Sequence, residues 1–576
     1  MASEQDLVAA SRALGTGPAD PVQLQRLGRS IARAISRGQF ADRKIKIAVL
    51  SSFLTDMLRE ALSACLLARG IAAEIVSAPY GVIATDLLSG DSITRSCDLV
   101  AILPTFRDLI HRPKPGCTRQ EAIDASLLEV QYWQQLWQRI GSRPIVQLSF
   151  GPASVHPLSN ADGFAPGGLL RFMRDVNRTL ADDAPNNVAL LDAEALAARV
   201  GRGWNDPPTY FVCKQPFAIG ALTEIANSLA ATIAGLLGKA RKVLVLDLDN
   251  TLWGGVVGDV GLQGIVVGRE SAEGEAFVAI QEFARDLAAR GIILAVCSKN
   301  NEEIAREPFR SHSGMILRES DIACFVANFE DKATNLRRIA QTLNVGLESL
   351  VLVDDNPVER AWVARELPDV AVVDLPEDCA LYVDAIERAQ LFPVHRVTAE
   401  DLGRNQSYHS RDVVARVQEA GGDVSQFLRS LDPVVIREEV GPGSLERIVQ
   451  LIAKTNQFKL NPRTFTADEI VAFGEGVFAI RFRDRLQDYG IVAVAVTAVA
   501  ADELRILNWV MSCRVFSREL EHATLGLLQE YARTKGIRTL RAPFVLSAKN
   551  SVARDMMTAL GFAIDNNDDL VLDQIR

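Results

Sequence analysis

The chain has 576 residues, 48% of them hydrophobic and 23% charged, which is enough for three or four domains of about 100–200 residues each. Its formal net charge of −10 argues against a general surface for nucleic acid or anionic membranes. No two of the eight cysteines form a CxxC pair, and there are six histidines, so neither a disulfide framework nor a Cys/His metal site is indicated.

The N-terminal residues MASEQDLVAA lack the basic segment and apolar core of a secretory signal. No apolar run reaches the roughly 20 residues that a membrane-spanning helix needs. We therefore expect a cytoplasmic protein with neither a membrane nor a nucleic acid as its partner. This composition suits an enzyme and a binding protein equally well.

Residues 1–235 predict an α/β domain. The patterns indicate helices within 1–40, 54–69 and 216–237, and strands at 44–52, 72–77, 98–103 and 145–149. Strands that alternate with helices favour a parallel sheet covered by helices on both faces. Stretches rich in Gly and Pro at 111–119 and 151–168 indicate loops.

Residues 236–395 predict a second α/β domain with a Rossmann-like parallel sheet. Expected strands are 243–247, 292–297 and 349–353, with short ones near 264–267 and 370–373, and expected helices are 273–289, 301–308, 332–343 and 357–366. A polar, mostly helical linker is expected at 396–430.

Residues 431–576 have a different order of predicted strands and helices, which is typical of an α+β domain. The patterns predict antiparallel strands at 433–438, 477–483, 489–498 and 504–508, then a helix at 517–535, a strand at 538–542 and a helix at 550–559. The whole chain is therefore expected to be an α/β multidomain protein.

Polar residues follow three apolar strands of the middle domain. Asp247 and Asp249 follow the first, Ser298 and Asn300 the second, and Asp354-Asp355 the third. Open α/β sheets carry their chemistry just past the carboxyl ends of such strands. Two carboxylates on one strand tip can share a divalent cation, and Mg²⁺ prefers hard oxygen ligands. With Lys332 at the start of a predicted helix, this set suits phosphoryl transfer.

The order DxDxT, Ser, Lys, Asp-Asp resembles the four motifs of the haloacid dehalogenase superfamily, and more closely its FkbH-type branch. The matching segments are DLDNTLWGGVVG, GEAFVAIQEF, LAVCSKNNEEI, FVANFEDKATNLRRIA and LVLVDDNPVERAWV, which cover about 243–375 in order. One departure is Asp259-Val260-Gly261, where another acid is expected near Val260. This departure lies in the segment expected to form a flap over the site and does not affect the catalytic set.

The resemblance implies a role for each matching position. Asp247 would be the nucleophile, Asp249 the general acid and then base, and Ser298 and Lys332 would contact the transferring phosphoryl group. Asn250, Thr251 and Asn300 would support substrate binding. The implied Mg²⁺ ligands are Asp247, the backbone carbonyl of Asp249, Asp354 and Asp355. Taken singly, each of these residues also fits an ordinary role; Asp354-Asp355, for example, precede Asn356-Pro357 and could cap a helix.

Two further residues of the middle domain, Trp253 and Cys297, can each be interpreted in two ways. Trp253, before Gly254-Gly255, fits either a flap over the site or an ordinary turn with a core side chain. Cys297 fits either an acyl-carrying catalytic thiol or a small core residue. The core role is favoured for Cys297, because neighbouring strand residues point to opposite faces and nothing nearby lowers its pKa.

The flanking domains carry resemblances of their own. KIAVLSSFLTDML, AEIVSAPYGV and DLVAILP are similar to the SGNH-hydrolase-like region of long FkbH-type proteins, with Ser51 or Ser52 on the first loop. No His follows Asp206 in WNDPPTYFVCKQPF, so the triad is broken and a structural or carrier-docking role is expected.

The C-terminal domain resembles GNAT-type acyltransferases through KTNQFKLNPRTFT, DYGIVAVAV, NWVMSCRVFSRELEHATL and AKNSVARDMMTALGF. Its loop 514–519 lacks the pyrophosphate-binding glycines and contains Glu519, which disfavours acetyl-CoA. The fold could instead hold a pantetheine arm, and Cys513 is a second candidate thiol.

FkbH-type proteins move a glyceryl unit from 1,3-bisphosphoglycerate to an acyl carrier protein and remove phosphate on the way. The resemblance therefore implies a Mg²⁺-dependent glyceryl transferase/phosphatase for polyketide-type biosynthesis, with lactate as another possible three-carbon unit. Three alternatives remain: a stand-alone small-metabolite phosphatase, a non-catalytic carrier-docking scaffold, and a GNAT-type acetyltransferase.

Overall fold

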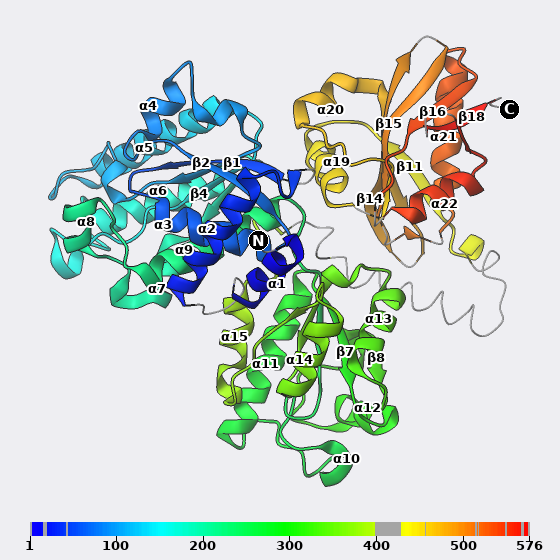
Figure 1. Ribbon diagram of the computed structural model, residues 1–576, viewed down its shortest axis with the longest axis horizontal. Helices are drawn as coiled ribbons and strands as arrows, with labels where there is room; N and C mark the ends of the chain where they lie inside the picture. The colour runs from blue at the N-terminus through cyan, green and yellow to red at the C-terminus, as the bar shows by residue number, and fades with distance from the viewer. Residues whose placement is uncertain are drawn as a thin grey trace. The chain divides into compact units, whose positions relative to one another are not determined.

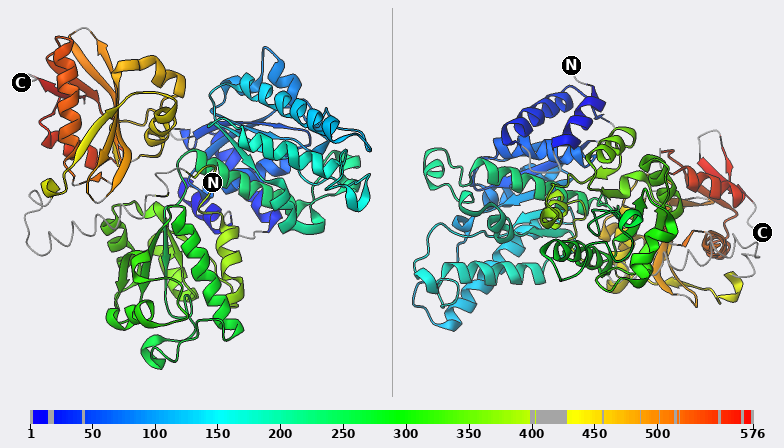
Figure 2. Two further views of the ribbon diagram at one scale, coloured as in Figure 1. Left: turned by 180° about the vertical axis from the view of Figure 1, so that it is seen from behind. Right: turned by 90° about the horizontal axis from the view of Figure 1, so that it is seen from below.

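The computed structural model describes residues 3–14, 20–41, 44–397, 402, 428–455, 457–485, 487–500, 502–512, 515–516, 518–547, 550–565 and 569–573. Figures 1 and 2 show the ribbon coloured by residue number. The chain divides into two compact units. The first contains Met1–Ala240 and Glu387–His395, and the second contains Arg241–Ile386 and Arg396–Arg576. Most of the expected linker at 396–430 lies outside the described residues.

The first unit is built on a five-stranded parallel sheet with the order β2-β1-β3-β4-β5. Its strands are β1 (Lys44–Ser51), β2 (Ala72–Ser77), β3 (Leu99–Leu103), β4 (Ile145–Leu148) and β5 (Val188–Leu191). The first four lie where the sequence predicted strands. The edge strand β5, with the four residues VALL, was missed although it is as long as β4.

Helices cover both faces of this sheet, as Figure 2 shows. One core cluster joins α1 (Glu4–Leu14), α2 (Pro21–Ser36), α3 (Asp56–Ala68), α7 (Ala193–Val200) and α9 (Ile219–Leu236). The other joins α4 (Ile83–Leu88), α5 (Arg119–Ile140) and α6 (Leu169–Asp182). Gly28 permits close packing of α2 on α3, since a Cβ there would lie 1.8 Å from the Glu60 carbonyl oxygen.

Residues 387–395 pack on α9 although more than 150 residues separate them in the chain. Asn227 Nδ2 donates to the Arg388 carbonyl at 3.2 Å, and Gln390 Nε2 donates to Ser228 Oγ at 2.7 Å. By length and composition, α9 is the one helix among the described residues that could cross a membrane. It lies in the core of this unit, where 67% of that window is buried.

The first part of the second unit has a parallel sheet with the order β10-β9-β6-β7-β8. Its strands are β6 (Val243–Leu246), β7 (Ile293–Ser298), β8 (Ile322–Ala327), β9 (Leu350–Val353) and β10 (Ala371–Val372). Its longer helices are α11 (Ala272–Ala289), α12 (Glu302–Ser311), α13 (Lys332–Leu343), α14 (Pro357–Glu366) and α15 (Tyr382–Ala389).

These elements agree with the predicted ones except for strand β8 and helix α15, which were not predicted. Edge strand β8 was missed although its six residues, IACFVA, are all apolar; its burial pattern alternates between buried and half-buried residues over the first four positions. The expected strand at 264–267 is present only as an isolated bridge between Gly254 and Val266.

The C-terminal part has a mostly antiparallel sheet with the order β11-β13-β14-β15-β16-β18-β17. Its strands are β11 (Val434–Glu438), β13 (Val477–Arg483), β14 (Asp488–Ala500), β15 (Glu503–Met511), β16 (Thr539–Pro543), β17 (Ala563–Ile564) and β18 (Asp569–Asp573). One core cluster includes α21 (Leu520–Thr534) and α22 (Ser551–Ala559), and another includes α19 (Pro442–Lys454) and α20 (Ala467–Phe473). The fold class is therefore the α/β multidomain arrangement that the sequence predicted.

A short strand, β12 (Phe458–Lys459), was not predicted and lies beside β15. β15 and β16 run parallel but pair only at residues 503–505 and 539–541. Beyond that point, Phe458 and Lys459 take the place beside Met511 and Val510. Asn461 Nδ2 completes the link by donating to the Leu507 carbonyl at 2.9 Å and the Pro543 carbonyl at 3.3 Å. The chain itself thus fills the gap between these two strands.

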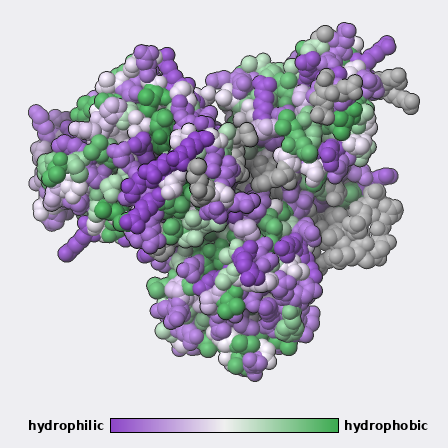
Figure 3. All heavy atoms as spheres, in the orientation of Figure 1, coloured by the Kyte–Doolittle hydropathy of each residue, from purple (hydrophilic) through white to green (hydrophobic). Residues whose placement is uncertain are grey.

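Hydrophobic and hydrophilic residues are interspersed on the face drawn in Figure 3. Exposed large hydrophobic side chains are normal when they are scattered singly. The exposed hydrophobic side chains that are informative are therefore those that lie beside a candidate site.

Candidate phosphatase site

Three parallel strands bring the predicted acids to one edge of the second unit. Leu246 of β6 lies beside Val296 of β7 and Val353 of β9. The backbone N–H of Asp247 then donates to the Val353 carbonyl at 2.9 Å. The loops after β6, β7 and β9 therefore start side by side, which places their polar residues in one neighbourhood.

Lys332 is the buried cation of this site. It is the first residue of α13, whose N-cap is Asp331, and its side chain is 3% exposed. Its Nζ lies 2.8 Å from Asp247 Oδ2 and also forms an ion pair with Asp354. Burial disfavours the charge, but the two carboxylates outweigh it and raise the pKa of Lys332. The lysine therefore remains charged at neutral pH.

The carboxylates beside Lys332 are crowded and desolvated. Burial, followed by the charge of Asp247, raises the pKa of Asp354 to about 6. The same two causes raise the pKa of Asp355. One lysine does not compensate three neighbouring acids, so the site favours a further positive charge.

The donor set fits a hard divalent cation. One oxygen from each of Asp247, Asp354 and Asp355 lies within 4.8 Å of the others. Asp247 Oδ1 is buried and has no hydrogen-bond partner among the described residues, although buried carboxylate oxygens are normally paired. A cation bound by these oxygens would satisfy that atom.

Asp249 faces a different set of partners. Its Oδ1 accepts from Trp253 Nε1 at 2.9 Å and from the Val257 N–H at 3.0 Å, and its Oδ2 accepts from Asn300 Nδ2 at 2.9 Å. Burial raises the pKa of Asp249, and Asp247 adds to the rise. Asp249 is thus an oriented carboxyl whose pKa is raised, which is the direction of change that a general acid requires.

The residues expected to support substrate binding have partners within the protein. Thr251 is fully buried; its Oγ1 accepts from the Asp355 N–H at 3.2 Å. Asn250 has a φ of 55° and accepts from the Gly255 N–H at 2.9 Å, which closes the turn into Trp253-Gly254-Gly255. With Asn300 bound to Asp249, these three residues position the acids. Ser298, the last residue of β7, is 2% exposed.

Cys297 lies in the apolar core on the other side of β7. Its side chain is fully buried in a cluster that includes Ala295 and Val326. Burial raises the pKa of the Cys297 thiol to about 12. A thiol that is buried and protonated is a poor nucleophile, so the structure favours the core role over the catalytic one.

Arg360 is a residue of the site that sequence reasoning missed. Its Nη1 donates to the backbone carbonyls of Asp354 at 2.9 Å and Asp355 at 2.7 Å, and its Nη2 donates to the Leu375 carbonyl at 3.2 Å. It thereby fixes the loop that carries two candidate metal ligands. The signal in the sequence that could have identified Arg360 was its position within the first turn and a half of the helix that follows Asp354-Asp355.

The other predicted sites are less complete. In the first unit, Ser52 Oγ donates to Thr105 Oγ1 at 3.4 Å, and Asp206 caps α8 (Pro207–Cys213). His111 pairs with Glu129, and His156 pairs with Asp162. In the C-terminal part, Cys513 and Arg514 lie outside the described residues.

Comparison with solved structures finds several matches, one of which covers 64% of this chain. It is the N-terminal part of the protein BF1531 from Bacteroides fragilis, which contains a phosphatase domain and was crystallised with Mg. The two share 30% identity over 99% of that chain and 64% of this one, with a TM-score of 0.59. The ribosomal-protein-S18-alanine N-acetyltransferase from Escherichia coli is similar to 25% of this chain over 94% of its own, at 16% identity and a TM-score of 0.20.

No family model matches the chain, and no curated protein matches it. The parallel sheet and the acids at its carboxyl edge define a phosphatase of the haloacid dehalogenase type. The chain belongs to the same family as the phosphatase-bearing part of BF1531.

Proposed function

We propose that this protein is a Mg²⁺-dependent phosphatase for a phosphorylated three-carbon acid and that it loads the acyl unit onto an acyl carrier protein. One observation carries the phosphatase assignment. Asp247 has one oxygen against Lys332, and its other oxygen is buried with no hydrogen-bond partner among the described residues. One oxygen from each of Asp247, Asp354 and Asp355 lies within 4.8 Å of the others. Mg²⁺, which the BF1531 structure contains, fits those hard oxygen ligands and would neutralise charge on the phosphoryl group.

The chain's own residues account for hydrolysis. An oxygen of Asp247 attacks phosphorus, the P–O bond to the substrate breaks, and Asp249 gives its proton to the leaving alkoxide. Lys332 offsets the negative charge that Asp247 and the phosphoryl group bring together. Asp249 then removes a proton from water, which attacks the aspartyl-phosphate and regenerates Asp247.

Acyl transfer requires a thiol, and the buried Cys297 is a poor source of one. We therefore assign capture to the carrier: the thiolate of its pantetheine attacks the acyl-phosphate carbon of 1,3-bisphosphoglycerate. A C–S bond forms, the C–O bond to phosphate breaks, and inorganic phosphate leaves with the bonding pair. The 3-phosphate is then removed at Asp247.

Intact-protein mass spectrometry and a phosphate assay test this proposal together. The full chain, a holo acyl carrier protein, 1,3-bisphosphoglycerate and Mg²⁺ should give a glyceryl adduct on the carrier and none on the enzyme. Asp247→Asn should abolish release of the 3-phosphate, whereas Asp286→Asn, at an exposed position of α11, should not. Normal phosphate release by Asp247→Asn would refute the mechanism.

A stand-alone small-metabolite phosphatase is the second candidate. The burial of Cys297 fits this function as well as the first one, because a phosphatase needs no protein thiol. Turnover of 3-phosphoglycerate at the same rate with and without carrier, with no adduct on the carrier, would establish it.

A further inference from the structure

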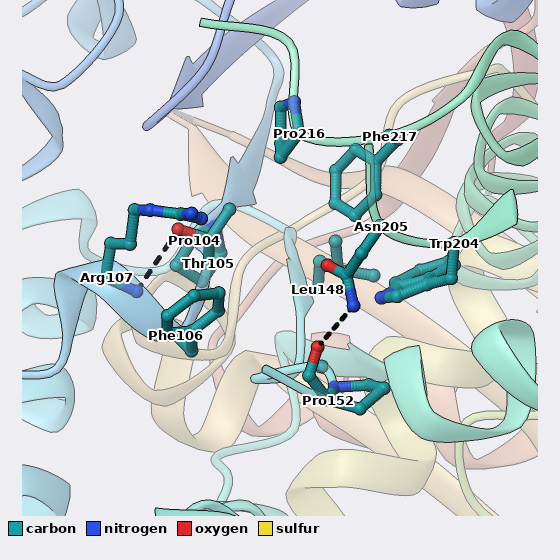
Figure 4. Close-up of a pocket in the computed structure, with 11 residues that line it drawn as sticks. Pro104, Thr105, Phe106, Arg107, Leu148, Pro152, Trp204, Asn205, Pro216 and Phe217 are labelled. Carbon is teal, nitrogen blue, oxygen red and sulfur yellow. Dashed lines mark hydrogen bonds between the residues drawn. The ribbon is translucent and has the colours of Figure 1, made fainter. Parts of the chain in front are cut away.

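The carboxyl edges of the two parallel sheets differ in chemistry. Figure 4 shows the shallow depression at this edge of the first unit, where Asn205 Nδ2 donates to the Pro152 carbonyl at 3.2 Å beside Trp204 and Phe217. The described residues that line it include no carboxylate, so it offers no place for phosphoryl transfer. Recognition of a phosphorylated substrate therefore falls to the edge of the second unit's parallel sheet, which carries Asp247.

An ion pair joins the two segments that flank the acids of this edge. Lys299 follows Ser298 at the end of β7, and Glu359 lies in the first turn of α14, the helix after β9. The Lys299 Nζ lies 2.5 Å from Glu359 Oε1. Because β6 lies between β9 and β7 in the sheet, this pair connects the segments on either side of the loop that carries Asp247 and Asp249.

The cations beside the acids are engaged before a substrate binds. Lys332 Nζ pairs with Asp247 and Asp354, and the Arg360 guanidinium is held by backbone carbonyls. Lys299 is more accessible, with 42% of its side chain exposed, but it has a carboxylate partner as well. A second anionic group on the substrate would therefore have to compete with a carboxylate of the protein for Lys299.

The remaining surroundings are negative or apolar. Burial raises the pKa of Asp249, and the charges of Asp247 and Asp259 add to the rise. Asp259, in the segment expected to form the flap, thus places a further negative charge near the acids. Val358, the neighbour of Glu359 on α14, is apolar and 73% exposed. These groups favour a neutral group over an anion in the part of the substrate beyond the phosphate.

We propose that Glu359 is a specificity determinant of the phosphatase site: by pairing with Lys299, it withholds that cation from a second anionic group of the substrate. The site then favours a phosphate ester whose acid end is masked as an ester or thioester over the free phosphorylated acid. This inference rests on the phosphatase function proposed above and specifies which form of the three-carbon acid reaches Asp247. At the effective dielectric of a protein surface, one unscreened charge nearby changes a rate by about tenfold.

Substrates that differ in one group test the proposal. 3-Phosphoglycerate has a carboxylate where glycerol 3-phosphate has a hydroxymethyl group, and the methyl ester of 3-phosphoglycerate masks that carboxylate. With the full chain and Mg²⁺, kcat/KM for the methyl ester and for glycerol 3-phosphate should exceed that for the free acid by about tenfold. Equal values, or a preference for the free acid, would overturn the proposal.

Two substitutions should move this selectivity in opposite directions. Glu359→Gln releases Lys299 and should raise the kcat/KM ratio of 3-phosphoglycerate to glycerol 3-phosphate by about tenfold, chiefly through KM. Lys299→Met leaves Glu359 unpaired and should lower the same ratio. Glu366→Gln, at the other end of α14, is the matched control and should leave the ratio unchanged. Shifts of the same sign in the first two variants, or no shift, would overturn the role of Glu359.

Two further measurements separate failure of this inference from failure of the proposed function. Calorimetry on the Asp247→Asn protein, which is expected to hydrolyse neither ester, should show tighter binding of glycerol 3-phosphate than of 3-phosphoglycerate. Adding Glu359→Gln to that protein should remove the difference. Mg²⁺-dependent hydrolysis of p-nitrophenyl phosphate by the unchanged chain reports the phosphatase alone. Its presence without the expected selectivity would overturn only the role of Glu359, whereas its absence would overturn both.

Discussion

Lys332 is the buried counter-charge of Asp247: its Nζ lies 2.8 Å from Asp247 Oδ2, and both side chains are largely removed from solvent. The same ammonium also pairs with Asp354. One cation therefore holds two carboxylates that come from different strand ends, before any metal or phosphate binds.

Replacing Lys332 with methionine should destabilise the second unit and make its stability depend strongly on Mg²⁺. Removing one partner of a buried pair leaves uncompensated charge, at a cost of about 3 kcal/mol. In thermal unfolding, Mg²⁺ should raise the Tm of Lys332→Met more than that of the unchanged protein. Lys299→Met, which removes an ion pair at a more exposed position, should cost less than ~1 kcal/mol. Equal Mg²⁺ effects would contradict this role.

Arg360→Lys should weaken Mg²⁺ binding while the fold is retained. Lysine keeps the charge but cannot bridge the carbonyls of Asp354 and Asp355 as the planar guanidinium does. Loss of such a supporting contact raises the half-saturating metal concentration by roughly tenfold or more. Titration of phosphatase activity with Mg²⁺ measures this. Arg365→Lys, on the same helix but largely exposed, is the matched control and should leave the titration unchanged.

Trp253→Phe should lower kcat with little effect on KM. Phenylalanine keeps an apolar ring at this fully buried position but removes the indole donor to Asp249 Oδ1. Loss of one hydrogen bond of about 1.4 kcal/mol corresponds to roughly tenfold in rate if it orients the acid in the transition state. Trp362→Phe, at a partly exposed position on α14, controls for removal of an indole. A kcat equal to that of the unchanged enzyme would exclude an orienting role for Trp253.

The C-terminal part should become more stable as pH rises from about 8 towards 10.5. Burial lowers the pKa of Lys459 from 10.5 to about 8. Between these values the unfolded chain binds more protons than the folded one, so unfolding free energy increases with pH. The full effect of one such group is about 3 kcal/mol. Hydrogen exchange of peptides from β14 and β15 measures it, and Lys459→Met should remove this contribution from the slope. An identical slope in both proteins would show that Lys459 does not titrate as its burial requires.

Much of the fold was predictable from local pattern. Continuous apolar runs such as 243–246 and 350–353 form buried parallel strands, and their lengths match the prediction closely. The edge strands β5 and β8 were missed although they too are apolar runs. The inserted β12 was missed because it has two residues and pairs with β15, which is distant in the sequence.

The sequence by itself determined which residues meet at the phosphatase edge, because parallel strands in register bring their carboxyl ends together. Asp247, Asp249, Ser298 and Asp354-Asp355 follow from that rule, whereas Lys332, on a helix, was assigned from the motif order of the resemblance. Tertiary structure alone decided what each touches: Thr251 supports Asp355, Arg360 bridges the acid loop, and Cys297 is sealed in the core. Side-chain direction, burial and hydrogen-bond partners depend on packing between distant segments, which local spacing does not encode.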